Sequence, residues 1–73
     1  MNNKVEKTLK ENIKKYRLSK KLTQEKLSEI SGISSDYLSE IERGKKLPSL
    51  KRLFAIANAL NIEFYKLFIE YDK

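Results

Sequence analysis

The sequence contains no cysteine, no histidine and no tryptophan, and only one proline and two glycines among its 73 residues. Without cysteine, the chain can form neither a disulfide framework nor a thiolate metal site. Without histidine, it lacks the commonest general base and the commonest metal ligand. No glycine-rich phosphate loop and no spaced group of carboxylates takes their place. We therefore expect no catalytic residue, no metal and no cofactor, and an enzyme is the least favoured class.

Long apolar runs are also missing. Nothing in the chain approaches the roughly 18 consecutive apolar residues of a membrane span, and the N-terminus lacks the apolar stretch of a signal peptide. These absences predict a cytoplasmic protein without a membrane partner. The length predicts one domain over residues 1–73. So short a chain leaves little room for a pocket beside its core, so no small-molecule ligand is expected.

Basic residues are in excess, with a formal net charge of +6, and they are unevenly distributed. Residues 1–22 carry eight basic and two acidic groups, and residues 43–52 carry five basic groups. Between them, residues 23–42 carry one basic and five acidic groups. Basic segments on both sides of an acidic one suit a polyanion held along its backbone. A lysine-rich surface that only keeps a small protein soluble gives the same pattern, so charge alone decides nothing.

Two short helices joined by a tight turn are predicted over residues 23–44. Thr23 and Ser34 are good N-caps, because each hydroxyl can accept a hydrogen bond from a backbone N–H two or three residues further on. Gly32 and Gly44 are suited to end the two helices, because glycine readily adopts the left-handed conformation. Helices this short bury too little surface by themselves, so flanking helices must supply the rest of the core.

Apolar residues recur at helical spacing on both sides of this pair of helices. The stripe before it consists of Val5, Leu9, Ile13 and Tyr16. After it, a fourth helix is predicted between a cap at Ser49 and an end at Asn61, followed by a fifth from about Glu63 to Tyr71. The stripe of the fourth helix consists of Leu50, Leu53, Phe54, Ala57 and Leu60. No stretch alternates apolar and polar residues in the manner of a strand. The predicted fold is all-α, a bundle of five helices.

Several spaced residues resemble one known family. A Thr-Gln pair opens a helix at Thr23, Leu27 and Gly32 follow, and the stretch Tyr-Leu-x-x-Ile-Glu-x-Gly from Tyr37 precedes Pro48. The pattern is similar to the Cro/CI-type (XRE-like) helix-turn-helix family, which includes phage repressors, small bacterial regulators and restriction–modification controller proteins. The resemblance covers nearly the whole chain. It implies a lambda-repressor-like bundle, double-stranded DNA as the partner, and a role in transcription regulation.

In similar proteins the second helix of the motif lies in the DNA major groove, with its outward side chains toward the base edges. The resemblance therefore implies base contacts by Ser34, Ser35, Asp36, Ser39 and Glu40. Serine can donate or accept, and a carboxylate can accept from cytosine N4. This face departs from the commoner Gln- or Arg-rich pattern, so sequence selectivity is expected to depend more on Arg43 and on DNA shape. The alternative is that Asp36 and Glu40 are ordinary solvated residues.

Other residues are expected to hold the DNA backbone or the scaffold. The predicted phosphate-contacting residues are Gln24, Arg43, Lys45 and Lys46. Gln24 aligns with a family residue that holds a phosphate, at a helix start whose free N–H groups suit an anion; an ordinary surface glutamine is the alternative. The resemblance also implies an ion pair between Arg17 and Glu42 that ties the recognition helix to the first helix. Two unconnected surface charges are the competing interpretation.

The C-terminal stretch over residues 63–71 is too aromatic for a frayed tail. If Phe64 and Phe68 fill the core, Tyr65, Ile69 and Tyr71 are left exposed, and exposed aromatic surface suggests a partner. Many similar proteins pair through this end of the chain. We therefore predict a homodimer whose interface includes Tyr65, Phe68, Ile69 and Tyr71. Simple core filling by the two phenylalanines is the alternative.

The sequence is compatible with two functions. The first is a sequence-specific regulator on a palindromic operator, which would repress by blocking RNA polymerase or activate by touching it. The second is a helix-turn-helix protein-interaction module, antitoxin-like or an anti-regulator, with weak or non-specific DNA binding. The acidic recognition helix is the main support for the second.

Overall fold

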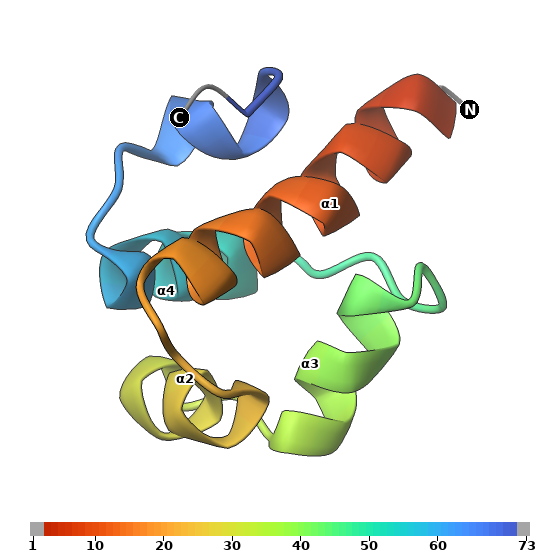
Figure 1. Cartoon of the computed structure of the whole chain (residues 1–73). Coiled ribbons are helices and arrows are strands. Elements are labelled where there is room, and N and C mark those ends of the chain that lie inside the picture. Colours follow the sequence, from red (N-terminus) through yellow and green to blue (C-terminus); the bar gives the residue numbers. More distant parts are fainter. Residues whose placement is uncertain (1–2, 72–73) are drawn as a thin grey trace.

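The computed structural model describes residues 3–71, and these form four α-helices and a final 3-10 helix (Figure 1). The elements are α1 (Asn3–Ser19), α2 (Gln24–Ser31), α3 (Ser35–Glu42), α4 (Leu50–Leu60) and the 3-10 helix η1 (Phe64–Phe68). Figure 1 shows α2 and α3 at one end of the molecule and η1 at the other, with α1 between them. No helix within residues 3–71 is long and apolar enough to cross a membrane.

The caps predicted for the two short helices are present. Thr23 Oγ1 accepts from the Lys26 N–H at 2.9 Å, and Ser34 Oγ accepts from the Tyr37 N–H at 3.1 Å. Gly32 ends α2 in the left-handed conformation, with φ 75°, and its N–H donates to the Ser28 carbonyl. These local bonds define the turn between α2 and α3.

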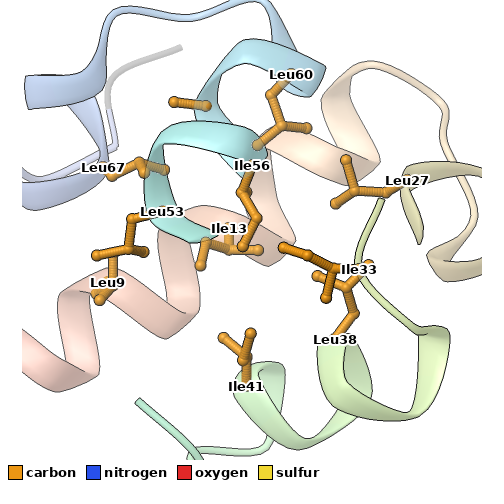
Figure 2. Close-up of a cluster of buried hydrophobic side chains, with 11 residues drawn as sticks. Leu9, Ile13, Leu27, Ile33, Leu38, Ile41, Leu53, Ile56, Leu60 and Leu67 are labelled. Carbon is orange, nitrogen blue, oxygen red and sulfur yellow. The ribbon is translucent and has the colours of Figure 1, made fainter. Parts of the chain in front are cut away.

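The core lies where α1, α2, α3, α4 and η1 meet (Figure 2). Each helix contributes the apolar side chains of one face, as amphipathic helices around a common core do. The buried apolar residues are Leu9, Ile13, Leu27, Ile33, Leu38, Ile41, Leu53, Ile56, Ala57, Leu60 and Leu67. The outer members of two predicted stripes lie outside this core, since Val5, Leu50 and Phe54 are 43%, 65% and 49% exposed.

The prediction of a fifth α-helix over residues 63–71 is wrong. The chain forms only the five-residue η1 and is extended at Ile69, where φ is −116° and ψ is 160°. The reason is Asn12, a buried residue of α1. Its side-chain amide donates to the carbonyl of Leu67 at 2.9 Å, and also to those of Lys66 and Ile69. A continued α-helix would need the Lys66 and Leu67 carbonyls for its own bonds, so residues 3–71 form four α-helices and a 3-10 helix rather than five α-helices.

Candidate nucleic-acid interface

The C-terminal end of α3 is held by an ion pair between Arg17 and Glu42. Arg17 Nε donates to Glu42 Oε2 at 2.8 Å and Nη2 donates to Oε1 at 3.1 Å. The two side chains are 9% and 4% exposed. Arg17 Nη1 also donates to the carbonyl of Leu22 at 2.7 Å. One guanidinium thus joins α1, the loop before α2 and the end of α3, and a bidentate pair of this kind fixes orientation as well as distance.

Gln24, the first residue of α2, belongs to the same network. Its side-chain Nε2 donates to Glu42 Oε1 at 3.1 Å, so the carboxylate accepts hydrogen bonds from both α1 and α2. Sequence reasoning assigned Gln24 to a DNA phosphate and missed this contact. The amide nitrogen carries two hydrogens. Glu42 accepts one of them.

The face of α3 opposite its buried Leu38 and Ile41 carries the residues predicted to contact bases. Ser34 and Asp36 are exposed, while Ser35, Ser39 and Glu40 are half-buried. The Ser34 oxygen already caps the helix by accepting from the Tyr37 N–H, so its hydroxyl hydrogen is the part left for a base. The structure therefore brings together one hydroxyl-rich and acidic surface on the end of the molecule distant from η1.

Basic side chains follow directly after this surface. Arg43, Lys45 and Lys46 are all exposed. Arg43 Nε donates to Ser39 Oγ at 3.3 Å, one helical turn back. The Arg43 guanidinium therefore lies along the outward face of α3 and reaches the same surface as the serines. Glu42, the last residue of α3, directly precedes these basic residues and is the carboxylate that Gln24 contacts. All four predicted phosphate-contacting residues therefore lie near the C-terminal end of α3.

One further contact of α3 was not predicted. The Arg52 guanidinium of α4 lies over the ring of Tyr37, 5.2 Å from its centroid. A cation above an aromatic face is attracted by the ring quadrupole. The contact links α3 to α4. Two residues fifteen positions apart give no local signal that sequence reasoning could use.

The residues predicted to form a dimer interface are divided by the structure. Tyr65 and Ile69 are 58% and 50% exposed. Phe68 is half-buried and its ring meets Phe64 edge to face at 5.1 Å. Tyr71 was expected to be exposed, but it is half-buried because its ring packs edge to face on Tyr16 at 4.8 Å.

The apolar surface near this end extends onto α4. Phe64 stacks on Phe54 with ring centroids 4.1 Å apart. Phe54 and Leu50, one turn before it, are 49% and 65% exposed. Exposed apolar side chains that adjoin one another favour contact with a partner.

Two capped short helices, a braced second helix with a polar outer face, and basic residues after it define a helix-turn-helix domain of the DNA-binding type. Comparison with known proteins supports this class. A family model described as helix-turn-helix matches residues 13–67. The chain therefore belongs to the Cro/CI-type helix-turn-helix family of DNA-binding transcriptional regulators. Membership in a family of regulators agrees with the prediction that the chain is not an enzyme.

Individual relatives resemble the chain over most of its length. The control protein C.SmaI of Serratia marcescens is 38% identical over 63 residues, which cover 86% of this chain and 75% of that protein. The immunity repressor protein of Bacillus phage phi105 is 45% identical over 56 residues, covering 77% of this chain and 39% of the repressor. The crystal structure of the restriction-modification controller protein C.AhdI from Aeromonas hydrophila has a TM-score of 0.83 at 32% identity, covering 93% of this chain and 100% of that one.

Proposed function

We propose that this protein is a sequence-specific transcriptional regulator that binds a palindromic operator in double-stranded DNA as a homodimer. The observation that carries the proposal is the network of Arg17, Gln24 and Glu42. It fixes the angle of α3 against α1 and α2 while the polar face of α3 stays accessible. Base reading needs such a fixed helix, because a contact to a base edge tolerates little displacement.

The base contacts would come from the outward face of α3. The hydroxyls of Ser34, Ser35 and Ser39 can donate to or accept from several bases, whereas the carboxylates of Asp36 and Glu40 can only accept. Cytosine N4 is the donor that a carboxylate fits in the major groove. Because phosphates repel these carboxylates, α3 would be kept near the centre of the groove. The acidic character of the helix is therefore compatible with selective binding.

The backbone contacts would come from Gln24, Arg43, Lys45 and Lys46. These residues lie around the end of α3 and include three cations that neutralise phosphates without regard to sequence. They would supply affinity and position, and the serines and carboxylates would supply discrimination. Arg43 could contact either a phosphate or a base, because its guanidinium lies beside Ser39 on the outward face of α3.

The second copy would be held through the C-terminal end. Tyr65 and Ile69 are exposed there, and Phe68 and Tyr71 border them. Figure 1 places this end away from α3, so pairing would leave the recognition helix accessible. Symmetric pairing would set two recognition helices about 34–36 Å apart, one turn of DNA. Such a dimer, acting in the cytoplasm, would repress by excluding RNA polymerase from a promoter or activate by touching it.

A second candidate is a protein-interaction module that keeps this fold without selective DNA binding, as an antitoxin-like protein or an anti-regulator would. It is favoured by Asp36 and Glu40, two carboxylates on the helix that would face DNA. This candidate predicts DNA binding that is weak and indifferent to sequence.

Selection from a random DNA library at near-physiological salt, followed by sequencing, separates the two candidates. We expect an enriched palindrome with half-sites about one helical turn apart. A parallel selection with Asp36→Asn should enrich a different half-site, because the substitution changes an acceptor into a group that also donates. If the folded protein enriches nothing, the regulator proposal is wrong and a protein partner should be sought.

A further inference from the structure

We propose that Lys10 of α1, together with Lys45 and Lys46, forms a binding site for a phosphate of the DNA backbone at the end of α3. The inference rests on the proposed function, because it adds a residue of α1 to the DNA contacts. Sequence reasoning gave Lys10 no role. In the structure its side chain leaves the α1 surface and crosses to the turn between α3 and α4.

The crossing is possible because the residue beneath Lys10 is Gly44. A Cβ added at Gly44 would lie 3.2 Å from Lys10 Cδ and 3.3 Å from Lys10 Nζ. Gly44 also has φ +78°, a backbone conformation that other residues rarely adopt. The glycine therefore serves two purposes, since it ends the recognition helix and leaves room for the ammonium group to lie over the turn.

Lys10, Lys45 and Lys46 line one hollow of about 180 Å³. The remaining lining is Glu6, Leu9, Ile41, Gly44, Leu47 and Pro48, so Glu6 supplies the one carboxylate. Pockets for cofactors and drug-sized ligands are usually about 300–1,000 Å³. The smaller hollow, which three lysines line, suits a single small anionic group.

The hollow keeps a net positive charge within the part of the chain that the structure describes, since its lining holds three lysines against the Glu6 carboxylate. No carboxylate within residues 3–71 forms an ion pair with Lys10, Lys45 or Lys46 at 4.0 Å or less. Lysine charges that share one small space repel each other, and an anion bound there reduces that repulsion. Lysine is a frequent phosphate ligand because its ammonium group is a compact charge with three donors.

The position of the hollow favours DNA as the source of the phosphate. Gln24 contacts Glu42, the exposed Arg43 follows, and Lys10 crosses the next residue, Gly44. The hollow therefore continues the row of predicted phosphate-contacting residues from α2, past the end of α3, to α1. A row of this kind can follow successive phosphates of one strand, whereas a free phosphate ion would occupy the hollow alone.

The test compares Lys10→Met with Lys15→Met in the full-length protein. Both substitutions remove one positive charge from α1, and Lys15 is exposed and lines a different hollow, beside Ile69 and Tyr71. Binding to one fixed duplex is measured over a series of salt concentrations. Each phosphate contact contributes about 0.9 to the slope of log K against log salt. A dimer that loses two such contacts should have a slope less steep by about 1.8.

We expect Lys10→Met to show this change, Lys15→Met to keep the wild-type slope, and Lys10→Arg to restore it. Sedimentation is used to verify that all variants have the same mass. If the wild type binds DNA and the slope of Lys10→Met is the same as that of Lys15→Met and of the wild type, this inference is wrong and the proposed function stands. If the wild type shows no salt-dependent DNA binding, both fail. An NMR titration with inorganic phosphate tests whether the hollow binds free phosphate instead. Saturable binding at Lys10 and Gly44, together with a wild-type salt dependence of DNA binding in Lys10→Met, would also overturn the assignment.

Discussion

The side-chain amide of Gln24 donates to Glu42 Oε1 at 3.1 Å, onto the same carboxylate that Arg17 holds from α1. Glu42 is therefore the point at which α1, α2 and α3 are joined by side chains. Its own side chain is 4% exposed, so water cannot replace its partners. A single carboxylate thus controls both the stability of the domain and the angle of its recognition helix.

Replacing Glu42 should be strongly destabilising. Glu42→Ala leaves the Arg17 guanidinium buried without its counter-charge, which costs about 3–5 kcal/mol in comparable proteins. For a domain of this size each kcal/mol lowers the melting temperature by about 4–8 °C. Thermal and urea unfolding followed by circular dichroism measures the loss. Glu40→Ala on the same helix is the control and should stay within about 0.5 kcal/mol of wild type. Equal stability of the two variants would show that the pair does not hold α3.

The contacts of Glu42 also show which features of the structure can be predicted from the sequence and which cannot. The N-caps at Thr23 and Ser34 and the left-handed turn at Gly32 could be predicted from the sequence, because they depend only on residues a few positions away. The Arg17–Glu42 pair was indicated only by resemblance to a family. Periodicity alone gives no partner across 25 positions. The contact of Gln24 with Glu42 was missed for the same reason.

The error at the C-terminal end has a similar origin. Helical spacing of aromatic residues after Glu63 predicted an α-helix, but spacing does not reveal that Asn12, more than fifty residues earlier, takes the carbonyls of that segment. Tertiary contact therefore overrode a local preference. The exposure of Leu50 and Phe54 likewise depends on how α4 is rotated in the assembled bundle, which the apolar stripe does not determine.

Asn12 should be essential to the position of η1. Asn12→Leu keeps the approximate size of the side chain but removes the donor, so the Leu67 carbonyl loses its partner. An unsatisfied buried acceptor costs about 1–3 kcal/mol. We expect this loss of unfolding free energy, together with faster amide hydrogen exchange over residues 64–69. Asn58→Leu, at an exposed position of α4, is the matched control. Unchanged exchange in Asn12→Leu would mean that packing of Leu67 alone fixes the segment.

Base contacts and phosphate contacts should respond differently to substitution. Arg43→Ala is expected to weaken binding to all sequences and to make the salt dependence less steep. Ser35→Ala or Asp36→Asn should instead change the preferred base at one position, which for a good contact amounts to about 1–3 kcal/mol of discrimination. Competition titrations against a panel of single-base operator variants measure both effects. The site assignment is wrong if either surface change leaves the whole panel unaffected.

The dimer can be tested at Tyr65, which is 58% exposed. Tyr65→Glu would place a charge in the proposed interface, where desolvating an unpaired carboxylate opposes association. Sedimentation should then give the mass of a monomer, with the helical circular dichroism signal retained. Ile30→Glu on α2, at a side chain that is 50% exposed and outside the proposed interface, should leave the mass of the dimer unchanged. A dimer that survives both Tyr65→Glu and Ile69→Glu would place the interface elsewhere.

The two glycines provide a matched pair for separating stability from DNA contact. Gly32 and Gly44 have φ of +75° and +78°, so an alanine at either position is strained by about 1–2 kcal/mol. A Cβ at Gly32 meets nothing within 4 Å, whereas a Cβ at Gly44 meets the side chain of Lys10. Both alanine variants should therefore lose similar unfolding free energy. Only Gly44→Ala should also displace Lys10 and reduce the salt dependence of DNA binding, measured by titration at a temperature where both variants are folded. Identical salt dependence in the two variants would mean that the ammonium group of Lys10 does not need its place above the turn to bind DNA.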